Sequence, residues 1–481
     1  MKKFKSMKGW FGIALLLLSS ASAHAQFLRS SYFMEGTHYR MQLNPALAPG
    51  RGYINIPAIG SLNATVNSSS LGYQDIIDII DNSEDADFFT SQNFINRLDN
   101  MNHLNVNLST DIISAGWYKG RNFWSFNIGL RNDIGASIPR SMFEFLDKTN
   151  NVDKMNLAQL NEEVTNQSLR INSYAEVGLG FSRNITDRLT VGGRLKALLG
   201  IANTKLNIDR ISVASNITGW DGKPESLNYE QAQNLRGRAD INVEATLESS
   251  SKLLELQQST NEAGRSYIDK LDFGSFGFSG FGGAIDLGAS FKLTKRLTLS
   301  ASVLDLGFIK WSKSNTSVAK AVDSPDNHYE FTGNSPEELS QAYDFVDKVS
   351  SGEILNYDML QMEVQEGMEK SRTTSLTSTV VVGAEYALLG DWLVVGALYT
   401  GRFAKPKTLN ELTFSGNIRP NNFFNVAVSY SVLQGAGKTF GTAIKLGPLF
   451  VGTDYMFFGK NTKNVNAYIG LSLPLSKQKK G

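Results

Sequence analysis

The sequence contains no cysteine among its 481 residues. This absence excludes disulfides, cysteine-ligated metal sites, thiol catalysis and a lipid anchor on a modified N-terminal cysteine. Beyond the first 25 residues there is also no apolar run approaching the roughly 20 residues that a transmembrane helix needs. Any membrane that the chain spans must therefore be crossed by strands of a closed barrel, in which every backbone polar group is paired.

The first 25 residues have the pattern of an export signal. Four lysines accompany an apolar stretch from Trp10 to Leu18, and small residues follow at Ala23 and Ala25. We predict a signal peptide over residues 1–25 and a mature chain that begins at Gln26. The alternative, an uncleaved membrane anchor, is disfavoured because the apolar stretch is far shorter than the roughly 20 residues required.

The charge of the mature chain is nearly balanced. Without the four lysines of the leader, 43 basic residues stand against 46 acidic residues, so nucleic acid is not an expected partner. No linker rich in proline, or in serine and glycine, divides the chain, and strand-like runs continue almost to its end. We therefore predict one large domain over residues 51–481, preceded by a short segment over residues 26–50.

Side chains of alternating polarity are the main signal in this sequence. In residues 123–132, Trp124, Phe126 and Ile128 share one face while Ser125 and Asn127 share the other, which is the period of a strand with one apolar and one wet side. The same pattern recurs in residues 189–199, 285–293, 424–432 and 465–475. A soluble sandwich of two sheets would show the same alternation, so the connections must separate the two interpretations.

Short and long connections take turns along the chain. Tight turns are expected at residues 119–121, 186–187, 294–296 and 389–391, whereas residues 140–169 and 314–372 form long connections with helical patterns. Outer-membrane barrels alternate short periplasmic turns with long external loops in this way. We predict an all-β transmembrane protein, an antiparallel β-barrel of about 14 strands, within a range of about 12 to 16.

The strand count depends on residues 204–275. Residues 206–215 and 241–247 both look like strands. If they form a hairpin above the membrane, the barrel keeps about 14 strands; if they cross the bilayer, it has about 16.

A turn motif precedes the first predicted strand. Asn44, Pro45 and Ala46 favour a turn, so a compact segment inside or beneath the barrel is expected. This motif is similar to the N-terminal signature of the long-chain fatty acid transporter superfamily, a group of outer-membrane barrels. That resemblance implies that residues 26–50 form a plug in the lumen.

A second resemblance covers most of the chain. Residues 31–36, 282–288 and 304–311, together with the Asn-Pro-Ala motif, resemble a family of Bacteroidota-type outer-membrane barrels without an assigned function. That family is distantly related to the fatty acid transporters and to barrels that accompany a secretion machine. The resemblance implies the outer membrane of a Gram-negative bacterium, reached by export through the periplasm, and the lipid bilayer as a partner.

Two aspartates are expected to lie close together. Asp286 and Asp305 are at similar distances from the turn at Lys295, and Asp286 falls on the polar face of its strand. Paired carboxylates can perform acid-base chemistry or bind a cation. We favour instead a polar network in the lumen, in which these aspartates pair with Arg194, Lys196, Lys292 and Lys310.

Enzymatic activity is not expected. The three histidines of the mature chain, His38, His103 and His328, have no spacing typical of a metal site or of a serine-histidine pair, although a lipase or protease could assemble a triad from distant segments. The glycine-rich residues 274–283 do not lead into a helical pattern, so they predict strand bending or close packing rather than a phosphate loop. No metal or cofactor is predicted.

The predicted function is passive transport of small hydrophobic or amphipathic molecules. Apolar helical faces in the external connections, such as Leu339 with Tyr343 and Val346, would form an entry site or pack together as a lid. The alternative is a barrel that does not transport, and instead serves as a scaffold for a secretion or cell-surface attachment complex.

Overall fold

The structure is a computed structural model of the chain. It describes residues 29–477 except 56–60, 73, 76–77, 79–80, 83–85, 152–154, 261–265, 324, 334–336, 351–361, 391, 404–407, 422, 434–438 and 456–462. The predicted signal peptide therefore lies outside the described residues. None of the helices in the described part has the length and hydropathy needed to span a bilayer.

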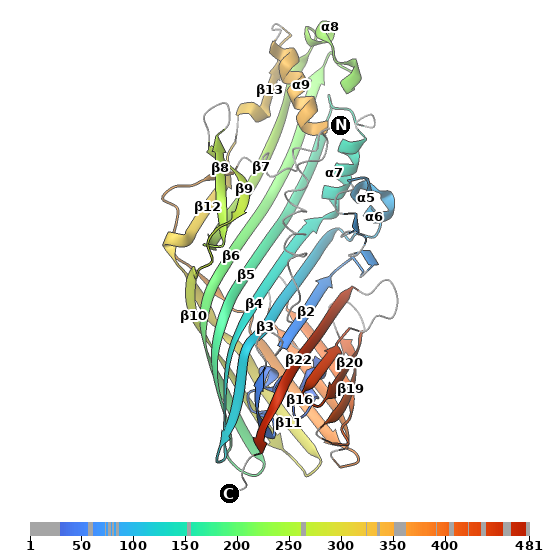
Figure 1. The fold of residues 1–481 in the computed structure, drawn as a ribbon. Helices are drawn as coiled ribbons and strands as arrows, with labels where there is room; N and C mark the ends of the chain where they lie inside the picture. The colour runs from blue at the N-terminus through green and yellow to red at the C-terminus, as the bar shows by residue number, and fades with distance from the viewer. Residues whose placement is uncertain are drawn as a thin grey trace.

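Fourteen antiparallel strand segments close into a barrel, as the alternation and the connections predict (Figure 1). Two of these segments are each divided in the ladder, β1 with β2 and β15 with β16. The first and last segments pair with each other, through β22 with β1 and β2, so the described strands of the wall form a closed ring. The strands in order around the wall are β1 (Arg51–Asn55) with β2 (Ser61–Ser68), β3 (Met101–Lys119), β4 (Asn122–Pro139), β5 (Asn161–Asn184), β6 (Leu189–Thr218), β10 (Gly280–Lys292), β11 (Leu297–Trp311), β15 (Arg372–Ser375) with β16 (Thr379–Ala387), β17 (Leu393–Arg402), β18 (Leu409–Ile418), β19 (Phe424–Leu433), β20 (Thr439–Leu446), β21 (Leu449–Thr453) and β22 (Asn464–Lys477).

The two faces of the wall are the reverse of those in a soluble protein. Large apolar side chains point outward and are exposed, with Leu195 63% and Phe281 64% accessible, whereas polar side chains such as Asp286 and Asn417 are fully buried inside. A sandwich would bury its apolar faces against each other, so this arrangement excludes it. The outward apolar belt requires lipid, and the protein is an outer-membrane barrel of a Gram-negative bacterium.

One end of the barrel continues into a tall extension (Figure 1). Strands β5 and β6 run beyond the barrel rim, and β7 (Arg236–Ser251) pairs with the outer half of β6 from Ala202 to Thr218. Residues 206–215 and 241–247 therefore belong to a hairpin above the membrane, which settles the count at fourteen. The extension also contains β8 (Leu254–Thr260), β9 (Ser266–Phe273), β12 (Thr316–Ala321), β13 (His328–Phe331) and β14 (Met362–Val364), with the helices α5 (Ala86–Thr90), α6 (Gln92–Ile95), α7 (Arg140–Asn150), α8 (Tyr229–Ala232) and α9 (Glu337–Ser350).

The extension has a dry core of its own. Phe89 and Phe94 pack edge to face at 5.6 Å, Phe143 adds a third ring, and α9 contributes Phe345, which is fully buried. Each such ring contributes about 1.5–3 kcal/mol by leaving water. Of the apolar helical face predicted on α9, Leu339 and Val346 pack inward in this core, whereas Tyr343 is 47% exposed.

One strand of the extension carries a pH-sensitive contact. The ring of His328 on β13 bonds to the carboxylates of Asp240 (2.9 Å) and Asp323 (2.6 Å), and these hydrogen bonds raise the pKa of His328 above its usual value. The raised pKa means that this contact stabilises the folded state fully below the ordinary histidine pKa, near 6.5, and loses strength as the pH rises through the raised value. We expect amide exchange of residues 328–331 to accelerate at alkaline pH, beyond the intrinsic rate. In a His328→Gln variant the excess should vanish, and an unchanged profile would contradict the assignment.

Candidate functional site in the barrel lumen

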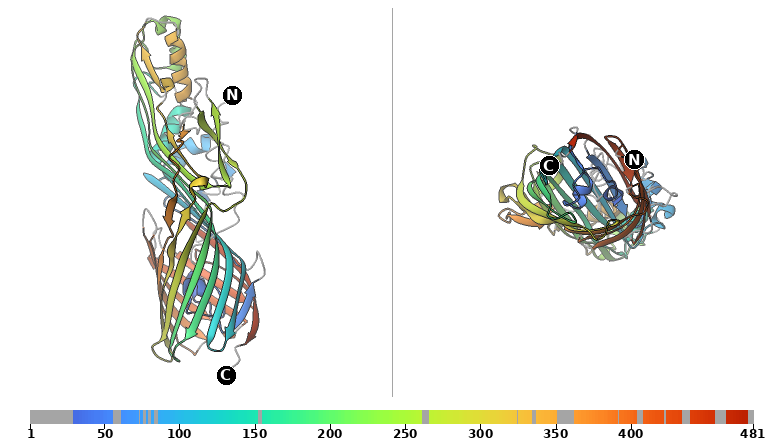
Figure 2. Two further views of the ribbon diagram at one scale, coloured as in Figure 1. Left: turned by 90° about the vertical axis from the view of Figure 1, so that its left-hand side faces the viewer. Right: turned by 90° about the horizontal axis from the view of Figure 1, so that it is seen from below.

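Residues 29–47 lie inside the barrel (Figure 2). They form two short helices, α2 (Arg29–Tyr32) and α3 (Arg40–Leu43), whose side chains are almost all buried. Seen from below, α2 and α3 lie within the ring of strands. The polypeptide backbone is the covalent connection between this segment and the barrel wall, since the chain has no cysteine. The position of the segment therefore depends on noncovalent contacts.

Asp454, just beyond β21, binds the start of this segment. Its carboxylate accepts hydrogen bonds from the backbone N–H groups of Arg29 (3.0 Å) and Ser30 (2.8 Å) and from the Ser30 hydroxyl (2.5 Å). The Arg29 guanidinium lies 3.3 Å from the Glu411 carboxylate and over the ring of Tyr455. These groups are largely buried, so water weakens the attraction between their charges only a little.

A second ion pair holds α3. The guanidinium of Arg40 pairs with the carboxylate of Glu385 on β16, and both side chains are about nine-tenths buried. The Tyr32 hydroxyl meets the Ser300 hydroxyl on β11 at 2.5 Å. Contacts with β11, β16, β18 and the residue after β21 therefore attach the segment to the side of the barrel formed by the second half of the chain.

The predicted turn motif rests against β10 and β11. The Asn44 side-chain amide donates to the carbonyl oxygens of Ala289 (3.1 Å) and Ala301 (3.2 Å), while its oxygen accepts from the Ala46 N–H (2.9 Å). This contact is possible because the wall carries glycine there: a Cβ on Gly288 would lie 2.1 Å from the Asn44 oxygen. The shape of the wall at β10 and β11 therefore matches the Asn-Pro-Ala motif.

Gly192 offers a direct test of this fit. A Cβ at this position would lie 2.4 Å from the backbone carbon of Pro45, closer than real contacts allow. We expect Gly192→Ala to displace the Asn-Pro-Ala turn, at a cost of about 1–3 kcal/mol, and to expose Arg40 to trypsin. The matched control is Gly193→Ala, whose Cβ would point outward with its nearest atom at 3.5 Å. Equal trypsin sensitivity of the two variants would contradict this prediction.

Four of the six residues of the predicted polar network come together. Lys196 on β6 lies 2.9 Å from the carboxylate of Asp286 and 2.6 Å from that of Asp305. Arg194 donates to the Met41 carbonyl at 2.9 Å, and its Nε lies 3.8 Å from Asp286. The cluster thus connects three strands of the wall to the N-terminal segment.

The structure does not bring Lys292 and Lys310 into this cluster. Asp305 has a left-handed backbone with φ of 57°, and the ladder between β10 and β11 shifts by one residue there. The Asp286 carboxylate accepts the Asp305 N–H at 2.8 Å, which holds this bulge. Because one extra residue exchanges the two faces of a strand, Lys310 points outward. Lys292 is on the lumen face but is exposed at the turn end of β10, about 20 Å along the strand from Asp286.

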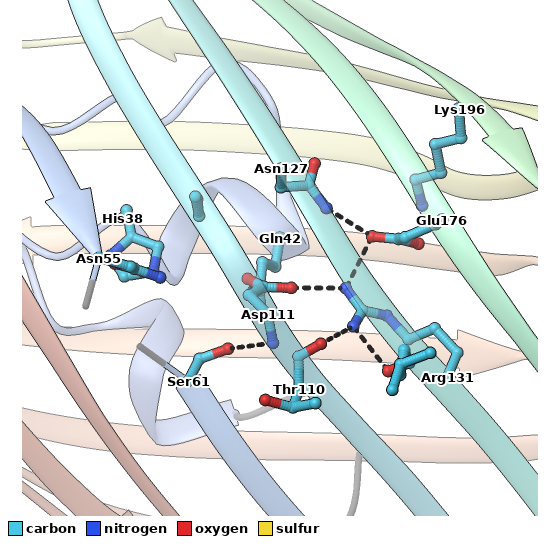
Figure 3. A network of polar contacts seen from close by, with 12 residues as sticks. His38, Gln42, Asn55, Ser61, Thr110, Asp111, Asn127, Arg131, Glu176 and Lys196 are labelled. Atoms are coloured by element: carbon cyan, nitrogen blue, oxygen red, sulfur yellow. Dashed lines mark hydrogen bonds and ion pairs between the residues drawn. The ribbon is translucent and has the colours of Figure 1, made fainter. Parts of the chain in front are cut away.

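A neighbouring network was not predicted from the sequence (Figure 3). The guanidinium of Arg131 on β4 lies between Asp111 (3.0 Å) and Glu176 (2.7 Å), and Asn127 also donates to Glu176 at 2.8 Å. Gln42 of the N-terminal segment donates to Asp111 at 2.7 Å. Arg131 and Asn127 are on the polar face of an alternating run, which was the available signal, but their partners on the neighbouring strands β3 and β5 depend on strand order and register.

A polar cavity of about 110 Å³ lies beside the N-terminal segment. Its walls include Tyr39 and Leu43 of that segment and charged side chains of both networks. At roughly 30 Å³ for each water molecule, the cavity has room for about three or four waters. Its lining residues are Ser31, Tyr39, Gln42, Leu43, Asn63, Ser109, Arg131, Asn132, Asp133, Asn172, Tyr174, Glu176, Arg194, Lys196, Asp305, Ser375, Leu376, Thr377 and Arg402.

An apolar cluster lies next to this cavity, toward the extension. Trp311 and Ile309 are fully buried inside the barrel, and Tyr174 and Leu376 pack with them. The Trp311 indole donates to the Thr374 hydroxyl at 2.8 Å. Tyr174 and Leu376 also line the polar cavity, so the apolar and polar regions share a boundary.

The wall is interrupted at this level. Strand β11 pairs with β16 from Leu297 to Leu304 and with β15 from Phe308 to Trp311, and the regular ladder is absent between these stretches. The opposite residues are 376–378, where the Leu376 N–H donates to the Gly307 carbonyl (2.9 Å) and the Ser378 hydroxyl to the Asp305 carbonyl (3.1 Å). The bulge at Asp305 therefore coincides with a weakened seam in the barrel.

In the described residues, no group of three or more histidine, aspartate or glutamate side chains is arranged to hold a metal ion. The charged side chains in the lumen instead pair with one another.

Comparison with known structures finds other barrels. The chain is similar to a deletion mutant of the monoaromatic hydrocarbon channel TodX (10% identity, covering 91% of this chain and 95% of that chain, TM-score 0.43). It is also similar to the toluene transporter TbuX of Ralstonia pickettii (9% identity, 95% and 96% coverage, TM-score 0.41) and to a FadL homologue of Pseudomonas aeruginosa (9% identity, 91% and 94% coverage, TM-score 0.35).

A search of curated protein sequences gives no match. A family model does match, over residues 45–454, and it describes a family of unknown function, DUF5723. This match confirms the predicted resemblance to a barrel family without an assigned function. The chain belongs to the DUF5723 family.

Proposed function

We propose that this barrel transports small hydrophobic or amphipathic molecules passively across the outer membrane, without enzymatic chemistry. The observation that carries the proposal is the interrupted ladder between β11 and β15–β16, beside the apolar cluster of Trp311. A transport route needs an opening that can form at low cost, and a seam with two isolated hydrogen bonds meets this need better than a regular ladder.

The charges in the lumen support a sideways route. An apolar cargo moving along the barrel axis would have to pass the ion pairs of Lys196 and Arg131 and separate groups that are costly to leave unpaired. A cargo held against Trp311 and Leu376 would instead reach the seam without crossing them, because Leu376 lies in the seam itself. In this proposal the cargo leaves the lumen between Gly307 and Leu376.

The N-terminal segment acts as a plug in the same proposal. Residues 26–50 are the proposed plug domain, with Asn44, Pro45 and Ala46 as its contact with the wall. The described part lies in the lumen beside the cavity, and noncovalent contacts hold it there: hydrogen bonds, ion pairs and the packing of its apolar side chains against the wall. A shift of this segment would change the cavity because Tyr39 and Leu43 line it.

A disulfide across the seam tests the route, and the absence of native cysteine makes the design unambiguous. Phe308 and Ser375 are directly opposite each other, just above the interruption. Opposed residues of antiparallel strands lie about 4.5–5.5 Å apart, which suits a disulfide. We expect the oxidised Phe308→Cys/Ser375→Cys variant to lose at least nine-tenths of its uptake of radiolabelled oleate and toluene. The measurement uses a Gram-negative host without its own hydrocarbon transporters.

The matched control places the disulfide in the regular part of the same ladder. Ala301 and Val382 are also opposed and also face outward, so Ala301→Cys/Val382→Cys should leave uptake unchanged. Reduction with dithiothreitol should restore uptake in the seam variant. Full uptake through the oxidised seam variant would refute the sideways route, and no uptake by the unmodified barrel would refute transport.

The size of the extension favours a second candidate, a scaffold for a secretion or surface-attachment complex. Its core is closed by β7, α7 and α9 and does not depend on the barrel lumen. For this candidate, uptake would be absent, and deletion of α9 would release a protein partner from the purified barrel.

A further inference from the structure

The glycine-rich segment that follows β9 carries a row of exposed aromatic rings. Phe273 and Phe276 are 65% and 71% accessible, and Phe276 packs edge to face with Phe278 at 5.9 Å. Such rings in contact with water would be unfavourable, and an apolar patch of this kind marks an interaction surface. The proposed transport route through the seam does not involve this patch.

The patch is continuous with the lipid-facing surface of the barrel. The segment returns to the wall at Ser279, whose N–H donates to the Gly200 carbonyl (2.7 Å), and β10 starts at the next residue. Phe281 then points outward, 64% accessible, with Leu199 of β6 opposite it on one side. The β8–β9 hairpin lies on the same side of the molecule, above the start of β10 (Figure 1). The rings therefore lie at the external rim of the apolar belt.

Two lysines accompany these rings. Lys310 is opposite Phe281 on β11 and faces outward because of the bulge at Asp305. The stem of Lys252 crosses the backbone between Phe276 and Phe278, since a Cβ on Gly277 would lie 2.9 Å from the lysine Cδ. Among the residues that the structure describes, no carboxylate lies within ion-pair distance of Lys310 or Lys252.

A lysine on the lipid-facing side of a barrel must place its ammonium group at the level of the headgroups. Its carbon stem packs on apolar neighbours and its charge seeks a polar partner, which at this depth is a headgroup phosphate. At most about 10 Å of chain separates Gly277 from Gly280, so both lysines border one patch.

Two acidic residues also lie near this patch. Glu255 lies against Gly274, and Asp272 accepts the N–H of Phe273, so both are at the β9 end of the segment.

We propose that Lys252 and Lys310, with Phe276, Phe278 and Phe281, form a binding site for one anionic, phosphate-bearing lipid of the outer leaflet. The ammonium groups bind the phosphate, and the rings pack against the upper part of the acyl chains. Glycine at position 277 leaves the space that the Lys252 stem occupies. This site would hold the base of the extension on the membrane surface, and it does not depend on transport.

Photo-crosslinking to lipid tests the site. The full barrel is reconstituted into vesicles that contain a diazirine analogue of phosphatidylglycerol or of phosphatidylcholine with the same acyl chains. Labelled peptides are then mapped by mass spectrometry. We expect phosphatidylglycerol to label residues 274–281 at least fivefold more than phosphatidylcholine does. Lys252→Ala/Lys310→Ala should remove most of this excess, and Phe276→Ser should lower labelling by both lipids.

The control variant, Lys292→Ala/Lys295→Ala, removes the same charge at the opposite rim, where both lysines are exposed. It should leave labelling of residues 274–281 within twofold of the unmodified barrel. Equal labelling by the two lipids, or an unchanged excess in Lys252→Ala/Lys310→Ala, would overturn the proposal. Circular dichroism of each variant confirms that the barrel is folded, so a loss of labelling reports on the site.

Discussion

Replacing Asp454 with alanine should release the N-terminal segment and convert a closed barrel into an open one. The Asp454 carboxylate is buried and accepts three hydrogen bonds from Arg29 and Ser30. Its removal leaves two backbone N–H groups without their acceptor and takes one negative charge from beside the buried Arg29 guanidinium. Loss of one partner from a buried charged cluster costs about 3–5 kcal/mol, which corresponds to a change of about 10²–10⁴ in the equilibrium between docked and released segment.

Two measurements follow the release. Single-channel recording in planar bilayers should show stable conductance for Asp454→Ala and none for the unmodified barrel, and trypsin should cleave after Arg40 only in the variant. Asp454→Asn, which retains one acceptor oxygen, should give an intermediate result. Asp187→Ala is the control, since Asp187 is exposed in the tight turn before β6. A closed, trypsin-resistant Asp454→Ala barrel would show that the segment is held by other contacts.

Asp286→Ala should give the largest loss of stability in the barrel wall. This carboxylate is fully buried, pairs with Lys196 at 2.9 Å and accepts the Asp305 N–H that holds the bulge. The substitution leaves Lys196 with one partner, Asp305, and frees a backbone N–H. We expect the free energy of unfolding to fall by about 3–5 kcal/mol.

Urea unfolding in lipid vesicles, followed by tryptophan fluorescence, measures this change. The double variant Lys196→Met/Asp286→Ala should recover part of the loss, because removing both charges avoids a buried unpaired ion. Lys292→Ala on the same strand is the control and should change stability by less than about 0.5 kcal/mol, since its side chain is exposed. A change of under about 1 kcal/mol for Asp286→Ala would mean that the ion pair contributes little.

The alternating strands and the order of short and long connections were readable from the sequence. Both depend on local rules: side chains of a strand alternate between faces, and a tight turn needs only its own few residues. The hairpin at residues 206–247 was ambiguous because its strands have the same period inside and outside a membrane. Only the pairing of β6 with β10 in the wall, and with β7 above it, decided that this hairpin lies in the extension.

The polar side chains of the lumen also divide into those whose position the sequence predicts and those that only the structure places. Arg194, Lys196 and Asp286 share the polar faces of their strands, so their position in the lumen could be expected from alternation alone. The outward position of Lys310 could not, because the one-residue bulge at Asp305 depends on the hydrogen bond that the Asp305 N–H donates to Asp286 on the neighbouring strand. The sequence by itself determined which side chains avoid lipid, since polarity and period are local. Strand order, register and the bulge determined which of them meet, because those contacts join residues on different strands, with Lys196 and Asp305 separated by 109 positions.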